Sequence, residues 1–346
     1  MNYEEFKKYI NRSIPNIPEV ITEEWLKQSL KNLLFNIWGF SFSDLSNIKF
    51  DNNISPNIIK RIPFSTETKF PTNSIIKANN KMYEIDEVIK KLHNNGITGE
   101  GINVAVIDYG FKVVHNELKD NIVSYTSFGE IESHFHGTVV SSKIVGKNLG
   151  VAPGAKLYFY EARRANQVEE VMKSLVDIYE KNKNGANIRV VNISASMHRE
   201  SDKFDEIVSK LQTQNCYVID SIIFGDKFTC INKDSITGEY YYSTWQEEKV
   251  NFFKSKIAIV SGGNFIPLNY TEDGYMYCGE SSYSWCIPVF SGLFTLGLQI
   301  NSNLTLENFI NIAVENKKIN ENGIALFDIK NTFKSILENK GKNKCV

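Results

Sequence analysis

The chain has 346 residues, of which 42% are hydrophobic and 23% are charged, enough to bury one large core and still carry an appended segment. Its 39 Lys and Arg residues nearly balance its 40 Asp and Glu residues, so no overall charge attracts nucleic acid or an anionic membrane. We therefore expect neither as a partner, and the function must be sought in local motifs.

The beginning of the sequence and its cysteines indicate where the protein works. The first residues, MNYEEFKKYINRS, lack the basic start and the unbroken apolar run of a secretory signal. The apolar stretch WLKQSLKNLLFNIWGF contains Lys27 and Lys31, so we expect no membrane span. The five cysteines form no Cys-x-x-Cys pair and are odd in number, which favours reduced thiols. These features predict a cytoplasmic protein without a metal ion or other cofactor.

Residues 1–80 are expected to form an N-terminal helical and irregular segment. From Thr22, a suitable N-cap, to Trp38 the apolar residues recur at helical spacing: Leu26, Leu30, Leu33, Leu34 and Ile37. Residues 41–80 are rich in Asn, Ser, Pro and Thr, which predicts an irregular strap. Because the apolar stripe of the helix must be buried, we expect it to pack on the main domain and the segment to stay attached.

Residues 81–340 are expected to form the main domain, in which short apolar strands alternate with amphipathic helices. Helices are predicted over 83–94, 136–145, 168–180, 202–212 and 284–299, and strands over 103–107, 156–160, 188–194, 217–221 and 257–261. This alternation predicts a three-layer α/β fold, a mostly parallel sheet flanked by helices on both faces. In such sheets ligands bind at the carboxyl ends of the strands.

Three separated segments supply an acid, a base and a nucleophile near that edge. Asp108 ends the apolar strand in VAVIDYG, where an acid is costly unless a basic group receives it. His136 opens the small apolar stretch HGTVVSSKIVG. Ser284 opens the helix in SYSWCIPVFSG, with Pro288 expected in the first turn, where a missing N–H is tolerated. A serine hydroxyl becomes a good nucleophile when a neighbouring base accepts its proton.

In these motifs the chain resembles the subtilase family of serine peptidases. VAVIDYG is similar to the family's aspartate motif, HGT with the downstream IVGKNLGVAPGAKL to its histidine motif, and SYSWCIPVFSG to its serine motif, in the family's order. The segment VVNISAS, residues 190–196, looks like the strand that lines the family's substrate cleft. The resemblance covers residues 96–333. It implies a subtilisin-like fold and a triad in which Asp108 orients His136, the general base, and Ser284 is the nucleophile.

Neighbouring residues offer alternatives to two members of this triad. His134 also lies in HFHG, but only His136 directly precedes Gly-Thr, so we expect His134 at the rim of the cleft. Ser281 and Ser282 compete with Ser284, and the position of Pro288 decides for Ser284.

The donor that would stabilise a substrate oxyanion is left open by the sequence. The family supplies a side-chain amide from a loop where this chain carries Asp226, whose charge would repel an oxyanion. Asn264 in SGGN has the right composition but lies close to Ser284 along the chain. Asn232 and the backbone amide of Ser284 are the other candidates.

The resemblance implies a serine endopeptidase that hydrolyses peptide or protein substrates through an acyl-enzyme. The alternative is a catalytically weak or inactive scaffold that binds peptides or proteins. Ser282 and Tyr283, where the family usually has Gly-Thr, favour the alternative. An insertion-like stretch, residues 230–254, carries an aromatic cluster that we expect to pack on the domain rather than to form a pocket: Tyr240, Tyr241, Tyr242 and Trp245.

Overall fold

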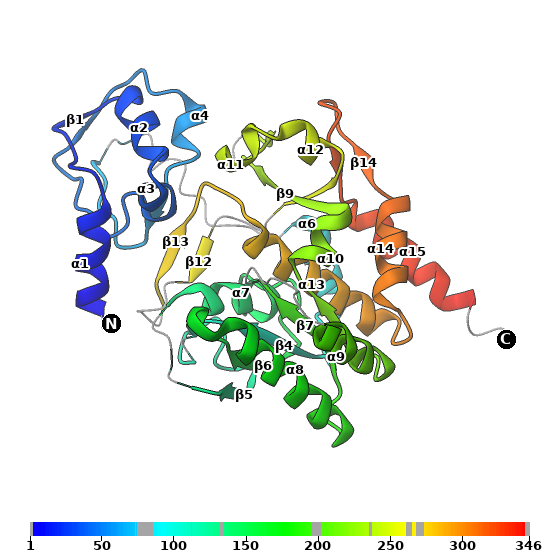
Figure 1. Ribbon diagram of the computed structural model, residues 1–346. Helices are drawn as coiled ribbons and strands as arrows, with labels where there is room; N and C mark the ends of the chain where they lie inside the picture. The colour runs from blue at the N-terminus through cyan, green and yellow to red at the C-terminus, as the bar shows by residue number, and fades with distance from the viewer. Residues whose placement is uncertain are drawn as a thin grey trace.

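The computed structural model describes residues 3–72, 74, 86–111, 113–129, 131, 134–194, 202–234, 237–260, 265–267 and 273–342. A parallel sheet flanked by helices forms the centre of the molecule, and residues 3–72 form a separate lobe beside it (Figure 1). The three-layer α/β fold expected from the sequence is confirmed.

The central sheet has five parallel strands in the order β5, β6, β4, β7, β8. Its strands are β4 (Asn103–Asp108), β5 (Ile122–Ser127), β6 (Lys156–Glu161), β7 (Ile188–Ile193) and β8 (Tyr217–Ile219). Along β4, Val104 and Val106 face one hydrophobic core, and Ala105 and Ile107 face the other. This two-sided burial is the reason why β4 reads as an unbroken apolar run.

Helices cover both faces of the sheet. On one face α7 (His136–Val145) packs against α13 (Tyr283–Ile300), and on the other α8 (Gln167–Lys183) packs against α9 (Asp202–Thr213). These helices lie within a few residues of their predicted bounds. α6 (Glu87–Asn94) matches the described part of the helix predicted over 83–94.

The apolar helix α13 runs through the middle of the core, in contact with α7 and β7. It carries no charge and is long and apolar enough to cross a membrane, but 78% of it is buried inside the protein. The sequence analysis did not identify this uncharged run as a possible membrane span. Burial between α7 and β7 accounts for its composition, since the core helix of a globular domain needs apolar residues on all sides.

A second sheet continues the fold toward the C-terminus, in the order β10, β9, β11, β15, β14. Its strands are β9 (Phe228–Lys233), β10 (Tyr240–Tyr241), β11 (Ile257–Val260), β14 (Lys318–Ile319) and β15 (Ala325–Leu326). The elements around it are η1 (Arg164–Asn166), α10 (Ser221–Lys227), α11 (Thr244–Glu247), α12 (Val250–Lys254), α14 (Leu306–Glu315) and α15 (Ile329–Lys342). The stretch that the sequence indicated as an insertion, residues 230–254, begins within β9.

Residues 3–72, called the N-terminal module below, are more ordered than the expected strap. They contain α1 (Tyr3–Ser13), β1 (Val20–Ile21), α2 (Glu23–Leu30), α3 (Leu33–Trp38), β2 (Lys49–Phe50), α4 (Pro56–Ile59) and β3 (Phe64–Ser65). The single helix predicted from Thr22 to Trp38 is wrong. The helix is interrupted after α2, because the side chain of Asn32 accepts hydrogen bonds from Leu34 N and Phe35 N and so starts a new helix.

The stripe on α2 is buried mainly within the N-terminal module. Leu26 and Leu30 pack with Phe35 and Phe40, and Leu149 is the buried residue that the main domain adds to this cluster. The part of the stripe on α3 packs on the main domain as expected, since Leu34 and Ile37 pack against a cluster that contains Phe135 and Val139. The predicted boundary at residues 80 and 81 lies outside the described residues.

A short antiparallel sheet joins the N-terminal module to the main domain. Strand β3 pairs with β13 (Tyr275–Tyr277), which pairs with β12 (Phe265–Pro267). Phe64 stacks on Tyr277 with ring centroids 4.9 Å apart. In Figure 1 this hairpin lies between the blue N-terminal lobe and the start of α13.

Candidate active site

Asp108 and His136 are in direct contact at the carboxyl end of the central sheet. Asp108 is fully buried, and its Oδ1 lies 2.7 Å from His136 Nδ1. Because a carboxylate only accepts, Nδ1 donates this hydrogen bond, and a neutral His136 keeps Nε2 as a free acceptor. Oδ1 also accepts from Tyr109 N at 2.7 Å, whereas Oδ2 has no hydrogen bond among the described residues. A buried carboxylate in this position fixes the orientation and the tautomer of the imidazole.

The loop after β4 fixes the start of α7, where His136 is the first residue. Gly137 N donates to Tyr109 O at 2.8 Å, and His136 N donates to His134 Nδ1 at 3.1 Å. Gly110 has φ +71°, and a Cβ there would lie 2.3 Å from the carbonyl oxygen of His134. The loop can therefore approach the helix this closely only with glycine at this position.

Aromatic rings surround the imidazole of His136. Tyr109 stacks on it, with centroids 4.7 Å apart and an angle of 11°, and Trp285 lies 5.1 Å away. Burial, together with the charges of His136 and Arg164, lowers the pKa of His134 to about 3, so His134 stays neutral over the physiological range. Its Nδ1 accepts the amide of His136. His134 is half-buried, and through this bond it caps the start of α7.

A buried glutamate that the sequence analysis missed holds the loop from the other side. Glu161 ends β6 directly beside Asp108 in the sheet. Its carboxylate accepts from Gly110 N at 2.8 Å and from the Tyr125 hydroxyl at 3.1 Å. The available signal was that β6, like β4, ends in an acid after an apolar run.

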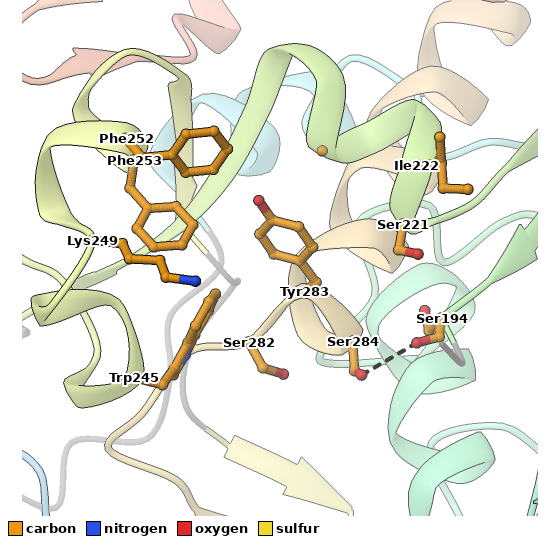
Figure 2. A pocket seen from close by; sticks show the side chains of 11 residues that line it. Ser194, Ser221, Ile222, Trp245, Lys249, Phe252, Phe253, Ser282, Tyr283 and Ser284 are labelled. Carbon is orange, nitrogen blue, oxygen red and sulfur yellow. Dashed lines mark hydrogen bonds between the residues drawn. The ribbon is translucent and has the colours of Figure 1, made fainter. Parts of the chain in front are cut away.

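Ser284 lies in the first turn of α13 and is close to this pair without bonding to it. Its Oγ donates to the carbonyl oxygen of Ser194, just after β7, at 3.3 Å, as Figure 2 shows. Within the described part of the chain no hydrogen bond joins Ser284 to His136, although Trp285, the next residue, contacts the imidazole. The structure thus brings Asp108 and His136 together and leaves Ser284 on a neighbouring acceptor.

The start of α13 differs in detail from its predicted form. The helix begins at Tyr283, one residue earlier than expected, so Pro288 is its sixth residue rather than part of the first turn. A proline there cannot donate to the carbonyl four residues earlier, which is that of Ser284. This backbone carbonyl consequently lacks its usual helical partner.

A cavity of about 690 Å³ opens beside Ser284. Its lining combines serines with large aromatic rings (Figure 2): Ser194, Ser221, Ile222, Gly225, Trp245, Lys249, Phe252, Phe253, Ser282, Tyr283 and Ser284. The aromatic residues of the insertion therefore lie in two different environments. Tyr242 is buried, as expected, whereas Trp245 is 48% exposed and forms one wall of the cavity.

The side chains near the expected oxyanion site offer no donor for an oxyanion among the described residues. Asp226 is exposed and pairs with Lys227 at 3.2 Å, and the acid that directly follows β8 is instead Asp220, which caps α10. Asn232 is buried and donates to the hydroxyl of Ser243 at 2.9 Å. Asn264 lies outside the described residues. The amide of Ser284 is in the first turn of a helix, where N–H groups have no intrahelical partner.

A family model described as the subtilase family matches residues 99–286. The chain belongs to the subtilase family. The resemblance found from the sequence is confirmed. The matched region includes Asp108, His136 and Ser284, but the match does not by itself test their roles.

Relatives and a solved structure are similar to parts of this subtilase. It is 31% identical over 96 residues to Subtilase-type proteinase psp3 of Schizosaccharomyces pombe, covering 26% of this chain and 21% of that protein. It is 31% identical over 137 residues to Subtilisin Savinase of Lederbergia lenta, covering 37% of this chain and 49% of that protein. The match thus spans half or less of these relatives. The structure of the prenylagaramide maturation protease PagA shares the fold, with a TM-score of 0.50 and 16% identity over 72% of this chain and 98% of that one.

Proposed function

We propose that this subtilase hydrolyses peptide bonds, with Ser284 as nucleophile, His136 as general base and Asp108 as the residue that orients His136. The observation that carries the proposal is the 2.7 Å hydrogen bond between Asp108 and His136 Nδ1, which leaves Nε2 free to accept a proton. The named relatives are proteinases, which supports a peptide or protein as substrate.

The first step requires Ser284 to change its hydrogen-bond partner. Rotation about χ1 would take Oγ from the carbonyl of Ser194 toward Nε2 of His136, which accepts the proton as Oγ attacks the substrate carbonyl carbon. His136 then returns this proton to the leaving amine, and an acyl-enzyme on Ser284 remains. Water attacks the ester in the second half, again through His136, and releases the acid and the free serine.

Negative charge on the substrate oxygen needs a donor in both halves of the reaction. The backbone amide of Ser284 supports this role, because it lies in the first turn of the 18-residue helix α13. Since Asp226 is an acid and the amide of Asn232 is engaged by Ser243, we assign no side-chain donor among the described residues. The substrate side chain next to the cleaved bond would enter the aromatic-walled cavity beside Ser284.

The second candidate function is a binding scaffold without efficient cleavage. The observation that favours it is the hydrogen bond of Ser284 to Ser194 in place of one to His136. Peptide binding in the cavity would then occur without acyl transfer. A cytoplasmic location stays a prediction under either function.

A fluorophosphonate probe separates the two functions, since it reacts with an activated serine. We expect the purified protein to be labelled at Ser284, as located by peptide mass mapping, and Ser284→Ala to abolish labelling and peptide hydrolysis. Ser281→Ala and Ser282→Ala are the matched controls and should keep the label. Labelling should fall in acid, because a protonated His136 cannot accept the serine proton. A folded wild-type protein that resists the probe at neutral and alkaline pH would favour the scaffold.

A further inference from the structure

The loop that leads into Ser284 is held by side chains from distant parts of the chain. This loop, residues 279–282 and called the serine loop below, directly precedes Tyr283 and Ser284. The hydroxyl of Ser243 bonds both the N–H and the carbonyl of Ser281, at 2.8 and 2.9 Å, and Trp245 Nε1 donates to the same carbonyl at 2.8 Å. The Tyr241 hydroxyl donates to Gly279 O at 3.2 Å.

Glu280, in the middle of this loop, makes a direct contact with the N-terminal module. Its Oε1 accepts from Arg61 Nη1 at 3.0 Å, and its Oε2 accepts from Thr244 N at 2.8 Å. The side chains of Arg61 and Glu280 are only 14% and 11% exposed. Because solvent screens this pair only weakly, the attraction between its charges is stronger than that of an exposed pair.

Arg61 also reaches the insertion that forms a wall of the cavity. Its Nη2 lies 3.1 Å from Glu247 Oε1 and 3.5 Å from the carbonyl of Tyr242. One guanidinium therefore joins the N-terminal module, residues 242–247 and the serine loop. Planar arginine, with donors on both sides, can bridge two carboxylates in this way, whereas lysine can offer only a point charge.

The backbones meet at the same place. A Cβ at Gly279 would lie 2.3 Å from the carbonyl carbon of Arg61, so these two segments touch directly. Tyr277 donates through its hydroxyl to the carbonyl of Lys60 at 2.8 Å, one residue before Arg61. The register of the N-terminal module against the serine loop is thus fixed by main chain as well as by charge.

We propose that Arg61 is a positioning residue for Ser284, and that the N-terminal module is thereby a working part of the active site. This inference rests on the proposed role of Ser284 as nucleophile. Without Arg61, the carboxylates of Glu280 and Glu247 lose the cation between them, and the serine loop is released on the side of the N-terminal module. Ser284 then spends less time in the geometry needed for attack, which lowers kcat more than it raises KM.

The decisive test compares Arg61→Gln with Arg12→Gln, an exposed arginine of the same module that does not touch the loop. We expect Arg61→Gln to lower the second-order rate of fluorophosphonate labelling by about 10- to 100-fold. A displacement of a reacting group by about 1 Å can lower a rate by about 100-fold. Arg61→Lys should recover part of the rate because it restores the charge. KM for a short peptide should change less than about twofold. Labelling of Arg61→Gln at the wild-type rate would overturn the proposal.

Amide hydrogen exchange provides a readout that does not depend on activity. Peptides covering residues 279–284 should exchange faster in Arg61→Gln and at the wild-type rate in Arg12→Gln. If Arg61→Gln does not fold, Glu280→Gln tests the same contact from the loop side with the same expected directions. Unlabelled wild-type protein would refute the proposed function, and exchange that is unchanged in both Arg61→Gln and Glu280→Gln would refute the positioning role itself.

Discussion

The two halves of the candidate site are built in different ways. The acid–base half, Asp108 and His136, is attached to the regular core: one residue ends a buried strand, and the other begins a buried helix. The nucleophile half, Ser284 and the serine loop, is held by the N-terminal module and by the insertion. The first half is already hydrogen bonded, whereas Ser284 has yet to leave Ser194. In the proposed function, assembly of the triad therefore depends on the half that the N-terminal module and the insertion hold.

The largest expected effect comes from changing the acid–base half alone. Asp108→Asn keeps the shape of the side chain but can hold His136 in the wrong tautomer, so we expect kcat to fall by about 10⁴-fold with little loss of folded protein. Steady-state hydrolysis of a peptide and a thermal melt measure the two quantities. Asp44→Asn, an exposed aspartate of the N-terminal module, is the control. Near-normal activity of Asp108→Asn would remove Asp108 from the triad.

A smaller effect is expected from displacing the nucleophile half. Gly279→Ala inserts a Cβ where only 2.3 Å separates it from Arg61, so the two segments must move apart. Overpacking of this kind costs about 1–3 kcal/mol, and we expect Tm to fall by several degrees and labelling of Ser284 by about tenfold. A variant with wild-type Tm and labelling would show that the serine loop does not need this close contact.

The smallest effect on catalysis is expected for Lys143, a buried residue of α7 whose change should alter stability instead. It is on α7, the helix of His136, and the thiols of Cys286 and Cys278 from the nucleophile side act on it electrostatically. Burial lowers the pKa of Lys143 to about 8, while unfolded lysine titrates near 10.4. Charging Lys143 therefore opposes folding below about pH 8, and stability should rise as the pH increases from about 8 to about 10.5.

Lys143→Met should remove this dependence. We expect the variant to be more stable than the wild type at pH 7, by up to about 3 kcal/mol, and to lose the gain between pH 8 and pH 10.5. Urea unfolding at several pH values measures both, with Lys147→Met, an exposed neighbour, as the control. A wild-type protein whose stability is flat over this range would contradict a lowered pKa of the buried Lys143.

By itself, the sequence determined the parallel core and indicated candidate residues at its carboxyl edge. Strands β4, β6 and β7 and helices α7 and α13 were predictable because their apolar residues follow each other at strand or helix spacing, and the motifs around Asp108, His136 and Ser284 are each local. The end of the helix before Asn32 could not be predicted, because the helical spacing of apolar residues continues across this position. One capping side chain, that of Asn32, starts the new helix there.

Only the tertiary structure decided how the nucleophile is held. Arg61 and Glu280 are 219 residues apart in the sequence, and Ser284 and Ser194 are 90 apart. Such pairs leave no periodic pattern, because their contact depends on how the N-terminal module, the insertion and the core pack together. The same holds for Trp245, whose ring lines a cavity while Tyr242, three residues earlier, is buried in a core. Periodicity reports which face of an element is apolar, but the partner of each side chain is chosen by packing.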